Sequence, residues 1–228
     1  MRDLRLTVGD YASPGGGQAP NPCVMGCAHL YLGSLFVFGE GGGGSEGGRV
    51  ESRLAVSAVL ANFRGSTTVD PRSRLTEALE HAGQVLRARS QSATAFQTAW
   101  ARCIAVLVRR NRLYAARVGD LYLALVRGGD IESVFGESDP AETKQSLLGQ
   151  PQAVTVQVRE AELQLGAGDR FVLSNGALSS AVEESEIGRL ASSLVPAVAA
   201  RRLVEAVDKM ARDNPVSVQV VQVGEMPL

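Results

Sequence analysis

Three short apolar segments follow one another in the middle of the chain, with only a few residues between them. Residues 103–108, 113–118 and 121–126 each have the length of a β-strand, and Gly, Asn, Asp and Arg fill the gaps. Such short connections require antiparallel neighbours, because a parallel pair needs a crossover of about a dozen residues or more. We therefore predict an antiparallel meander, and a continuous parallel βαβ series is excluded.

Segments with helical character lie on both sides of this meander. Asp70 is placed to cap a helix whose first turn contains Pro71, and apolar residues recur after it at helical spacing. The order of elements favours a two-sheet core with helices outside it. The other expected helices are 50–63, 183–194 and 196–212, and the other expected strands are 153–158, 171–173, 216–223 and a pair within 29–38 that turns at Gly33-Ser34.

Composition limits the class of protein. The 228 residues, 45% of them hydrophobic, suit a single domain spanning 1–228. A net charge of −1 provides no basic field for nucleic acid. An apolar stretch of about 18 residues is absent, so no membrane span is expected. The N-terminus lacks the apolar core of a signal peptide and the three cysteines do not suggest a disulfide framework, so we expect a cytoplasmic protein.

Four motifs resemble, in order and spacing, those of a known family. Residues 35–55, LFVFGEGGGGSEGGRVESRLA, match an apolar strand, Asp-Gly-x-Gly-Gly and a helix with Ser-Arg-Leu-Ala. Residues 113–129 match a meander around Val-Gly-Asp, residues 168–176 match Gly-Asp-Arg, a strand and Ser-Asp-Gly, and residues 213–223 match Asp-Asn and a final strand. Together they resemble the type 2C (PPM-type) metal-dependent serine/threonine protein phosphatases. The same match favours a loop, rather than a domain linker, for the glycine run at 39–48.

The resemblance implies an α+β fold, a four-layer α-β-β-α sandwich of two antiparallel sheets flanked by helix pairs. It also implies that the flap subdomain is lacking, because only about 18 residues separate Val134 from the strand expected at 153. In that family two Mn²⁺ or Mg²⁺ ions, bridged by a water, carry the hydrolysis of phosphoserine or phosphothreonine.

Oxygen ligands are what such hard divalent ions require, and the resemblance indicates where they should be. The bridging aspartate of the family corresponds to Glu40, and the carbonyl ligand to Gly41. The aspartate of Ser-Asp-Gly is replaced by Asn175, whereas the acid before the last strand is kept as Asp213. Asp120 matches a ligand of a third, weaker metal. Only Glu40 and Asp213 remain as core carboxylates.

The N-terminal motif Arg-x-x-Asn-Glu-Asp of the family is also altered. Gln18 replaces the arginine that would bind the substrate phosphate, and Pro22 and Cys23 replace the acids. We therefore expect no tightly bound cofactor and at most weak Mn²⁺ or Mg²⁺ binding. The sequence predicts a pseudophosphatase that binds a protein partner, such as a kinase, a phosphoprotein or a signalling domain, in serine/threonine phosphorylation signalling. The alternative is an active but atypical phosphatase.

A third hypothesis is a zinc-stabilised module. Cys23, Cys27 and His29 follow the spacing C-x3-C-x-H, and a fourth ligand would have to come from the distant Cys103 or His81.

Overall fold

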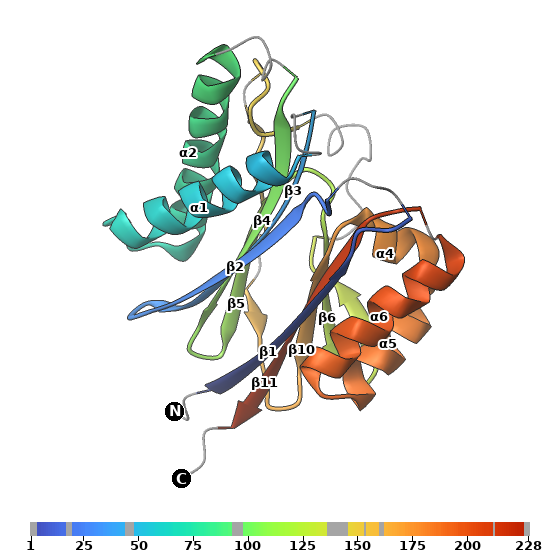
Figure 1. Cartoon of the computed structure of the whole chain (residues 1–228). Helices are drawn as coiled ribbons and strands as arrows, with labels where there is room; N and C mark the ends of the chain where they lie inside the picture. Colours follow the sequence, from blue (N-terminus) through green and yellow to red (C-terminus); the bar gives the residue numbers. More distant parts are fainter. Residues whose placement is uncertain are drawn as a thin grey trace.

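The computed structural model describes residues 4–16, 20–43, 48–92, 98–135, 146–152, 154–159, 162–211 and 213–225. Two antiparallel sheets pack face to face, and helices cover both outer faces (Figure 1). The α+β, four-layer architecture expected from the sequence is confirmed. The expected lack of a flap concerns a stretch of which residues 136–145 lie outside the described part of the chain.

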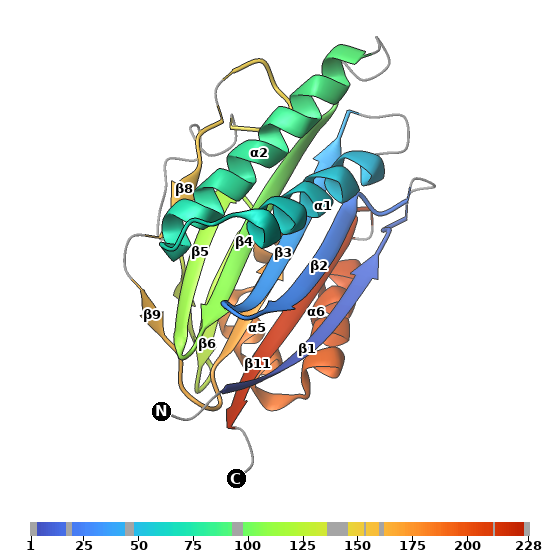
Figure 2. The ribbon, with the colours of Figure 1, turned by 90° about the vertical axis from the view of Figure 1, so that its left-hand side faces the viewer.

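The two sheets are built from segments far apart in the sequence (Figure 2). The last strand, β11 (Val216–Glu225), lies between β1 (Leu4–Ser13) and β10 (Arg170–Ser174), so the N-terminal strand pairs with the C-terminal one. The first sheet has the order β1 (Leu4–Ser13), β11 (Val216–Glu225), β10 (Arg170–Ser174), β6 (Tyr122–Arg127), β7 (Asp130–Ser133). The second has the order β2 (Cys23–Leu30), β3 (Gly33–Gly42), β4 (Trp100–Arg109), β5 (Arg112–Val118), β8 (Gln157–Val158), and β9 (Leu163–Gln164) also pairs with β5.

Each outer face has its own set of helices (Figure 1). Helices α1 (Arg49–Gly65) and α2 (Pro71–Ser92) cover the second sheet. Helices α4 (Gly176–Ala181), α5 (Glu184–Ser193) and α6 (Pro196–Met210) cover the first. Asp70 caps α2 as predicted, since its Oδ2 accepts a hydrogen bond from Ser73 N at 2.8 Å.

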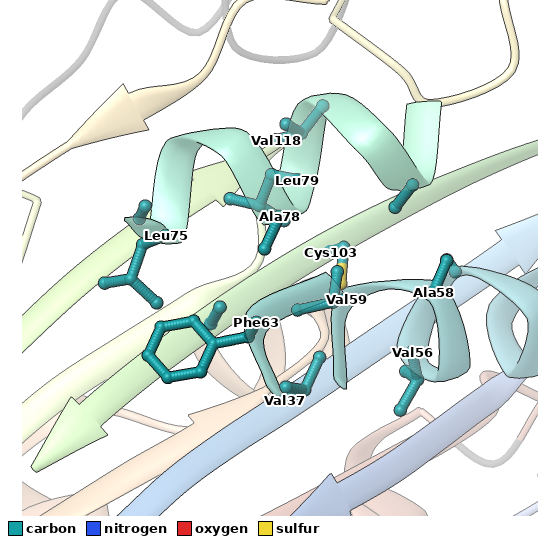
Figure 3. Packing of buried hydrophobic residues seen from close by; sticks show 14 of the residues in the cluster. Val37, Val56, Ala58, Val59, Phe63, Leu75, Ala78, Leu79, Cys103 and Val118 are labelled. Atoms are coloured by element: carbon teal, nitrogen blue, oxygen red, sulfur yellow. The ribbon is translucent and has the colours of Figure 1, made fainter. Parts of the chain in front are cut away.

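Strand alternation distributes the apolar residues over three cores. In β3, Phe36 and Phe38 point between the sheets, whereas Leu35 and Val37 pack under α1 and α2. Figure 3 shows this outer core, where Phe63 of α1 and Leu79 of α2 meet the sheet. Because both faces of β3 are buried, its sequence is continuously apolar rather than alternating.

Several elements differ from the sequence prediction. The β2–β3 turn lies at residues 31 and 32, not at Gly33-Ser34, because the register pairs Leu30 with Gly33. The strand expected at 153–158 is limited to Gln157–Val158, and α6 ends at Met210. Strands β1, β7 and β9, helix α4 and most of β2, which starts at Cys23 rather than at residue 29, were not predicted. They are short or at sheet edges, where tertiary contacts decide the conformation more than local pattern does. None of the described helices is long and apolar enough to cross a membrane.

Candidate functional site

Three of the predicted site residues, Glu40, Asp120 and Asn175, come from separate segments of the chain and are joined by Arg102 and by a direct hydrogen bond. Glu40 is near the end of β3, and Asn175 follows β10 and precedes α4. Asp120 is in the turn between β5 and β6. The strand register places Arg102 of β4 directly opposite Glu40 and places Cys23 of β2 on its other side.

Both carboxylate oxygens of Glu40 are occupied by protein donors. Arg102 Nη1 donates to Oε2 at 3.0 Å, and Asn175 Nδ2 donates to Oε1 at 3.1 Å. The Glu40 side chain is only 13% exposed, so little water competes for these oxygens. The guanidinium of Arg102 also places a positive charge directly beside this carboxylate. Glu40 is therefore neutralised from within the protein.

Arg102 connects Glu40 to a second carboxylate. Its Nε lies 3.0 Å from Asp120 Oδ1, an ion pair that lacks hydrogen-bond alignment. The guanidinium also stacks over the Trp100 ring, 4.9 Å from the centroid. Its alkyl stem lies across Gly119, where a Cβ would come within 2.5 Å of Arg102 Cγ. Gly119, at φ +88°, thus gives the side chain its path between the two acids.

Asn175 joins the two sheets. Its Nδ2 donates both to Glu40 of the second sheet and to Pro215 O at 2.9 Å, while its Oδ1 accepts from Ser217 N at 3.3 Å. This set of two acceptors and one donor fixes the orientation of the amide. Asn21 adds a second link, because its side chain bonds the Val216 carbonyl and the Ser217 hydroxyl.

Comparison with solved structures identifies the fold. A structure of the catalytic domain of the serine/threonine protein phosphatase PstP, in complex with two manganese ions, has a TM-score of 0.79 at 22% identity and covers 97% of this chain and 99% of its own. The serine/threonine phosphatase of *S. agalactiae* has a TM-score of 0.83 at 14% identity, with 96% and 99% covered. The fold is that of the PPM-type serine/threonine phosphatases.

A third neighbour of the PPM fold is PppA, described as a key regulatory component of T6SS in *Pseudomonas aeruginosa*. It has a TM-score of 0.79 at 20% identity and covers 96% of this chain and 97% of its own. Neither a protein-family model nor a curated protein matches the sequence. The structural likeness extends over nearly the whole chain, while the identities establish the fold alone.

The remaining predicted ligands of the PPM site have different environments. Gly41 is buried in β3, and its N–H donates to Pro22 O at 3.2 Å. Asp213 is exposed in the turn before β11, and its carboxylate makes no hydrogen bond or ion pair with another described residue. Gln18 lies outside the described residues. Burial, and then the charge of Glu40, raise the pKa of the Cys23 thiol far above its usual range, so it stays neutral.

The zinc hypothesis is wrong, for a geometric reason. Cys23 and Cys27 lie on one strand, β2, four residues apart, which separates their Cα atoms by about 13 Å. Two thiolates on one zinc ion must each lie about 2.3 Å from it. His29 does not fill the gap, since its Nδ1 lies 2.9 Å from Oγ of Ser34, the residue opposite it on β3.

A divalent metal centre does not fit the described residues either. Within the described ranges, no three His, Cys, Asp or Glu side chains gather where they could hold a metal ion. Glu40 and Asp120 face the guanidinium of Arg102, a cation that adds positive charge where metals would need negative oxygens. Asn175 directs its donor N–H, not its oxygen, at Glu40. The side chains of Glu40 and Asp120 are thus arranged around an arginine.

Sequence reasoning missed Arg102 and the structural role of Asn21. The strand containing Arg102 was expected to start at residue 103, so the arginine was placed outside it. The available signal was an arginine just before a long apolar run, in the segment Trp100–Arg109. A charged residue at the end of an otherwise buried strand usually has a partner, which could have prompted a search for an acid on a neighbouring strand.

Proposed function

We propose that this chain is a PPM-type pseudophosphatase, a binding or regulatory module rather than a metal-dependent hydrolase. The observation that carries the proposal is the state of Glu40, the one acid expected to bridge two metals. Its Oε2 accepts from Arg102 at 3.0 Å and its Oε1 accepts from Asn175 at 3.1 Å. A cation at Glu40 would therefore have to compete with a guanidinium and an amide donor for the same two oxygens.

Charge accounting supports the same conclusion. Two divalent ions bring four positive charges, and a binuclear centre stabilises them by several converging carboxylates. Here Glu40, Asp120 and the exposed Asp213 supply at most three negative charges, and Arg102 already compensates one of them. Asn175 supplies none. We therefore propose that Mn²⁺ or Mg²⁺ binds weakly at best, and that no metal-activated water forms between Glu40 and its neighbours.

The fold supports a role in signalling through a protein partner. A structural neighbour with this fold is described as a regulatory component, and that description applies to the neighbour alone. The proposed partner class is a kinase, a phosphoprotein or another signalling domain. Nucleic acid is not proposed, because the net charge of −1 provides no electrostatic attraction to a polyanion.

The alternative function is an atypical phosphatase that uses Glu40, Gly41, Asn175 and Asp213 with waters in place of the lost acids. Two observations favour it: a neighbour of this fold binds two manganese ions, and Asp213 is exposed and available. Hydrolysis of a phosphothreonine peptide, measured with millimolar Mn²⁺ as phosphate release, separates the two functions. We expect no release above the buffer rate.

Controls make that measurement decisive. The variants Glu40→Ala and Asp213→Ala should show the same baseline as the natural protein. Turnover by the natural protein that disappears in either variant would overturn the pseudophosphatase proposal. In parallel, fluorescence anisotropy can compare the binding of the phosphorylated and unphosphorylated forms of one peptide. This comparison tests whether the phosphatase-like domain binds a protein partner.

A further inference from the structure

The Arg102 side chain is shared by two carboxylates, one on the second sheet and one in the turn that connects the two sheets. Glu40 comes from β3 and Asp120 from the β5–β6 turn, and each has an oxygen 3.0 Å from a nitrogen of the same guanidinium. The three side chains are partly buried, with exposed fractions of 25% for Arg102, 13% for Glu40 and 31% for Asp120.

We propose that Arg102 takes the place of a bound metal: its guanidinium is the counter-ion of Glu40 and Asp120, and it keeps divalent ions from binding to these two carboxylates. The inference rests on the proposed loss of the metal centre and adds the residue responsible for it. A guanidinium stays charged throughout the accessible pH range and cannot dissociate from the chain. Glu40 and Asp120 therefore have a permanent counter-ion at any concentration of metal in solution.

The residues around Arg102 hold its side chain in a defined position, unlike that of an exposed surface ion pair. The planar group stacks on Trp100 at 4.9 Å, which leaves its edge free to meet the acids. Gly119 leaves space for the stem, since any side chain there would collide with it. Asn175 donates to the remaining oxygen of Glu40 from the opposite sheet. Glu40 is thus held from two directions by protein donors alone.

Two consequences can be measured. Stability of the natural protein should not depend on divalent metal, because the counter-ion is covalently part of the chain. Removal of the positive charge should leave Glu40 and Asp120 facing one another without compensation, and two such carboxylates attract a hard divalent cation. Arg102→Met, which keeps an unbranched side chain without charge, should therefore create Mn²⁺ binding that the natural protein lacks.

The experiment is a Mn²⁺ titration of purified full-length protein, followed by electron paramagnetic resonance of the free ion. We expect no saturable binding by the natural protein at millimolar Mn²⁺, and binding at least tenfold tighter by Arg102→Met. Arg102→Lys retains the charge and should behave like the natural protein. Arg127→Met, which removes the partner of Asp169 outside this pocket, is the matched control and should bind no Mn²⁺.

Thermal unfolding is the second readout. The midpoint of the natural protein should be the same in EDTA and in Mn²⁺, whereas Mn²⁺ should raise the midpoint of Arg102→Met. If Arg102→Met does not fold, Arg102→Gln takes its place, and folding of either variant only with Mn²⁺ would support the proposal. Equal Mn²⁺ affinity of the natural protein and the neutral variants would overturn it.

Failure of this inference can be told apart from failure of the proposed function. Mn²⁺ binding by the natural protein without phosphate release would refute the role of Arg102 and leave the pseudophosphatase standing. Phosphate release without saturable Mn²⁺ binding would refute the pseudophosphatase proposal and leave the role of Arg102 standing.

Discussion

Asn175→Asp restores the acid that the phosphatase resemblance implies at this position, and we expect it to destabilise the protein. In the natural chain, Asn175 Nδ2 donates to Glu40 Oε1 at 3.1 Å and to Pro215 O at 2.9 Å. An ionised aspartate has no proton to donate, so both acceptors lose their partner. A second negative oxygen would also lie close to Glu40.

The expected cost follows from these distances. Two unit charges about 3.1 Å apart repel by about 5 kcal/mol at an effective dielectric constant of about 20. Uptake of a proton by the new carboxyl relieves part of this, and the lost hydrogen bonds add about 1 kcal/mol each. We expect the variant to lose about 3–5 kcal/mol of unfolding free energy at pH 7.5.

The pH dependence has a definite sign. Repulsion by Glu40 should hold the pKa of the introduced Asp above its unfolded value of about 3.9. The deficit relative to the natural protein should therefore be full above the raised pKa and shrink as the pH falls through it. Urea denaturation at pH 7.5 and pH 5 measures both values. The reasoning predicts a smaller gap at pH 5.

A control variant and a metal arm complete the test. Asn214→Asp makes the same chemical change at an exposed site in the turn before β11 and should alter stability by less than about 0.5 kcal/mol. An Asn175→Asp protein as stable as the natural one in EDTA at pH 7.5 would refute the argument. Full recovery on addition of Mn²⁺ would show that a metal enters despite Arg102, and would refute the counter-ion assignment.

Two further predictions concern buried polar groups away from the site. Burial acts to raise the pKa of Asp169, but hydrogen bonds from Arg127 and from a backbone N–H outweigh burial and lower this pKa. The ionised Asp169 therefore stabilises the folded protein above about pH 4, and this contribution is lost as the pH falls further. Asp169→Asn should cost about 1–3 kcal/mol at pH 7 and flatten that acid-side loss in urea titrations, whereas Glu186→Gln, at an exposed pair, should change little. Arg74→Met should lower the unfolding free energy by about 2–4 kcal/mol in chemical denaturation. The reason is that buried Arg74 donates two hydrogen bonds, of 2.9 and 2.5 Å, to the carbonyl of Phe63 near the end of α1. A change under about 0.5 kcal/mol would show that water satisfies that carbonyl.

Local pattern was enough to predict the central elements of the fold. The apolar runs of β4, β5 and β6 are strands joined by tight turns, and α2 begins where Asp70 and Pro71 indicate. These features depend on residues within a few positions of one another. The edge strands β1 and β7 were missed, because their half-exposed sequences depend on the neighbour with which they pair.

The sequence by itself showed which residues stand where the phosphatase resemblance implies ligands, since Glu40, Asn175 and Asp213 can be read from their motifs. It could not show what compensates Glu40. That was decided by the tertiary structure, which brings Arg102 from 62 residues away and Asn175 from 135 residues away to the same carboxylate. The physical reason is that charge compensation acts over a few ångströms in space, and strand pairing and sheet packing set those distances independently of separation along the chain.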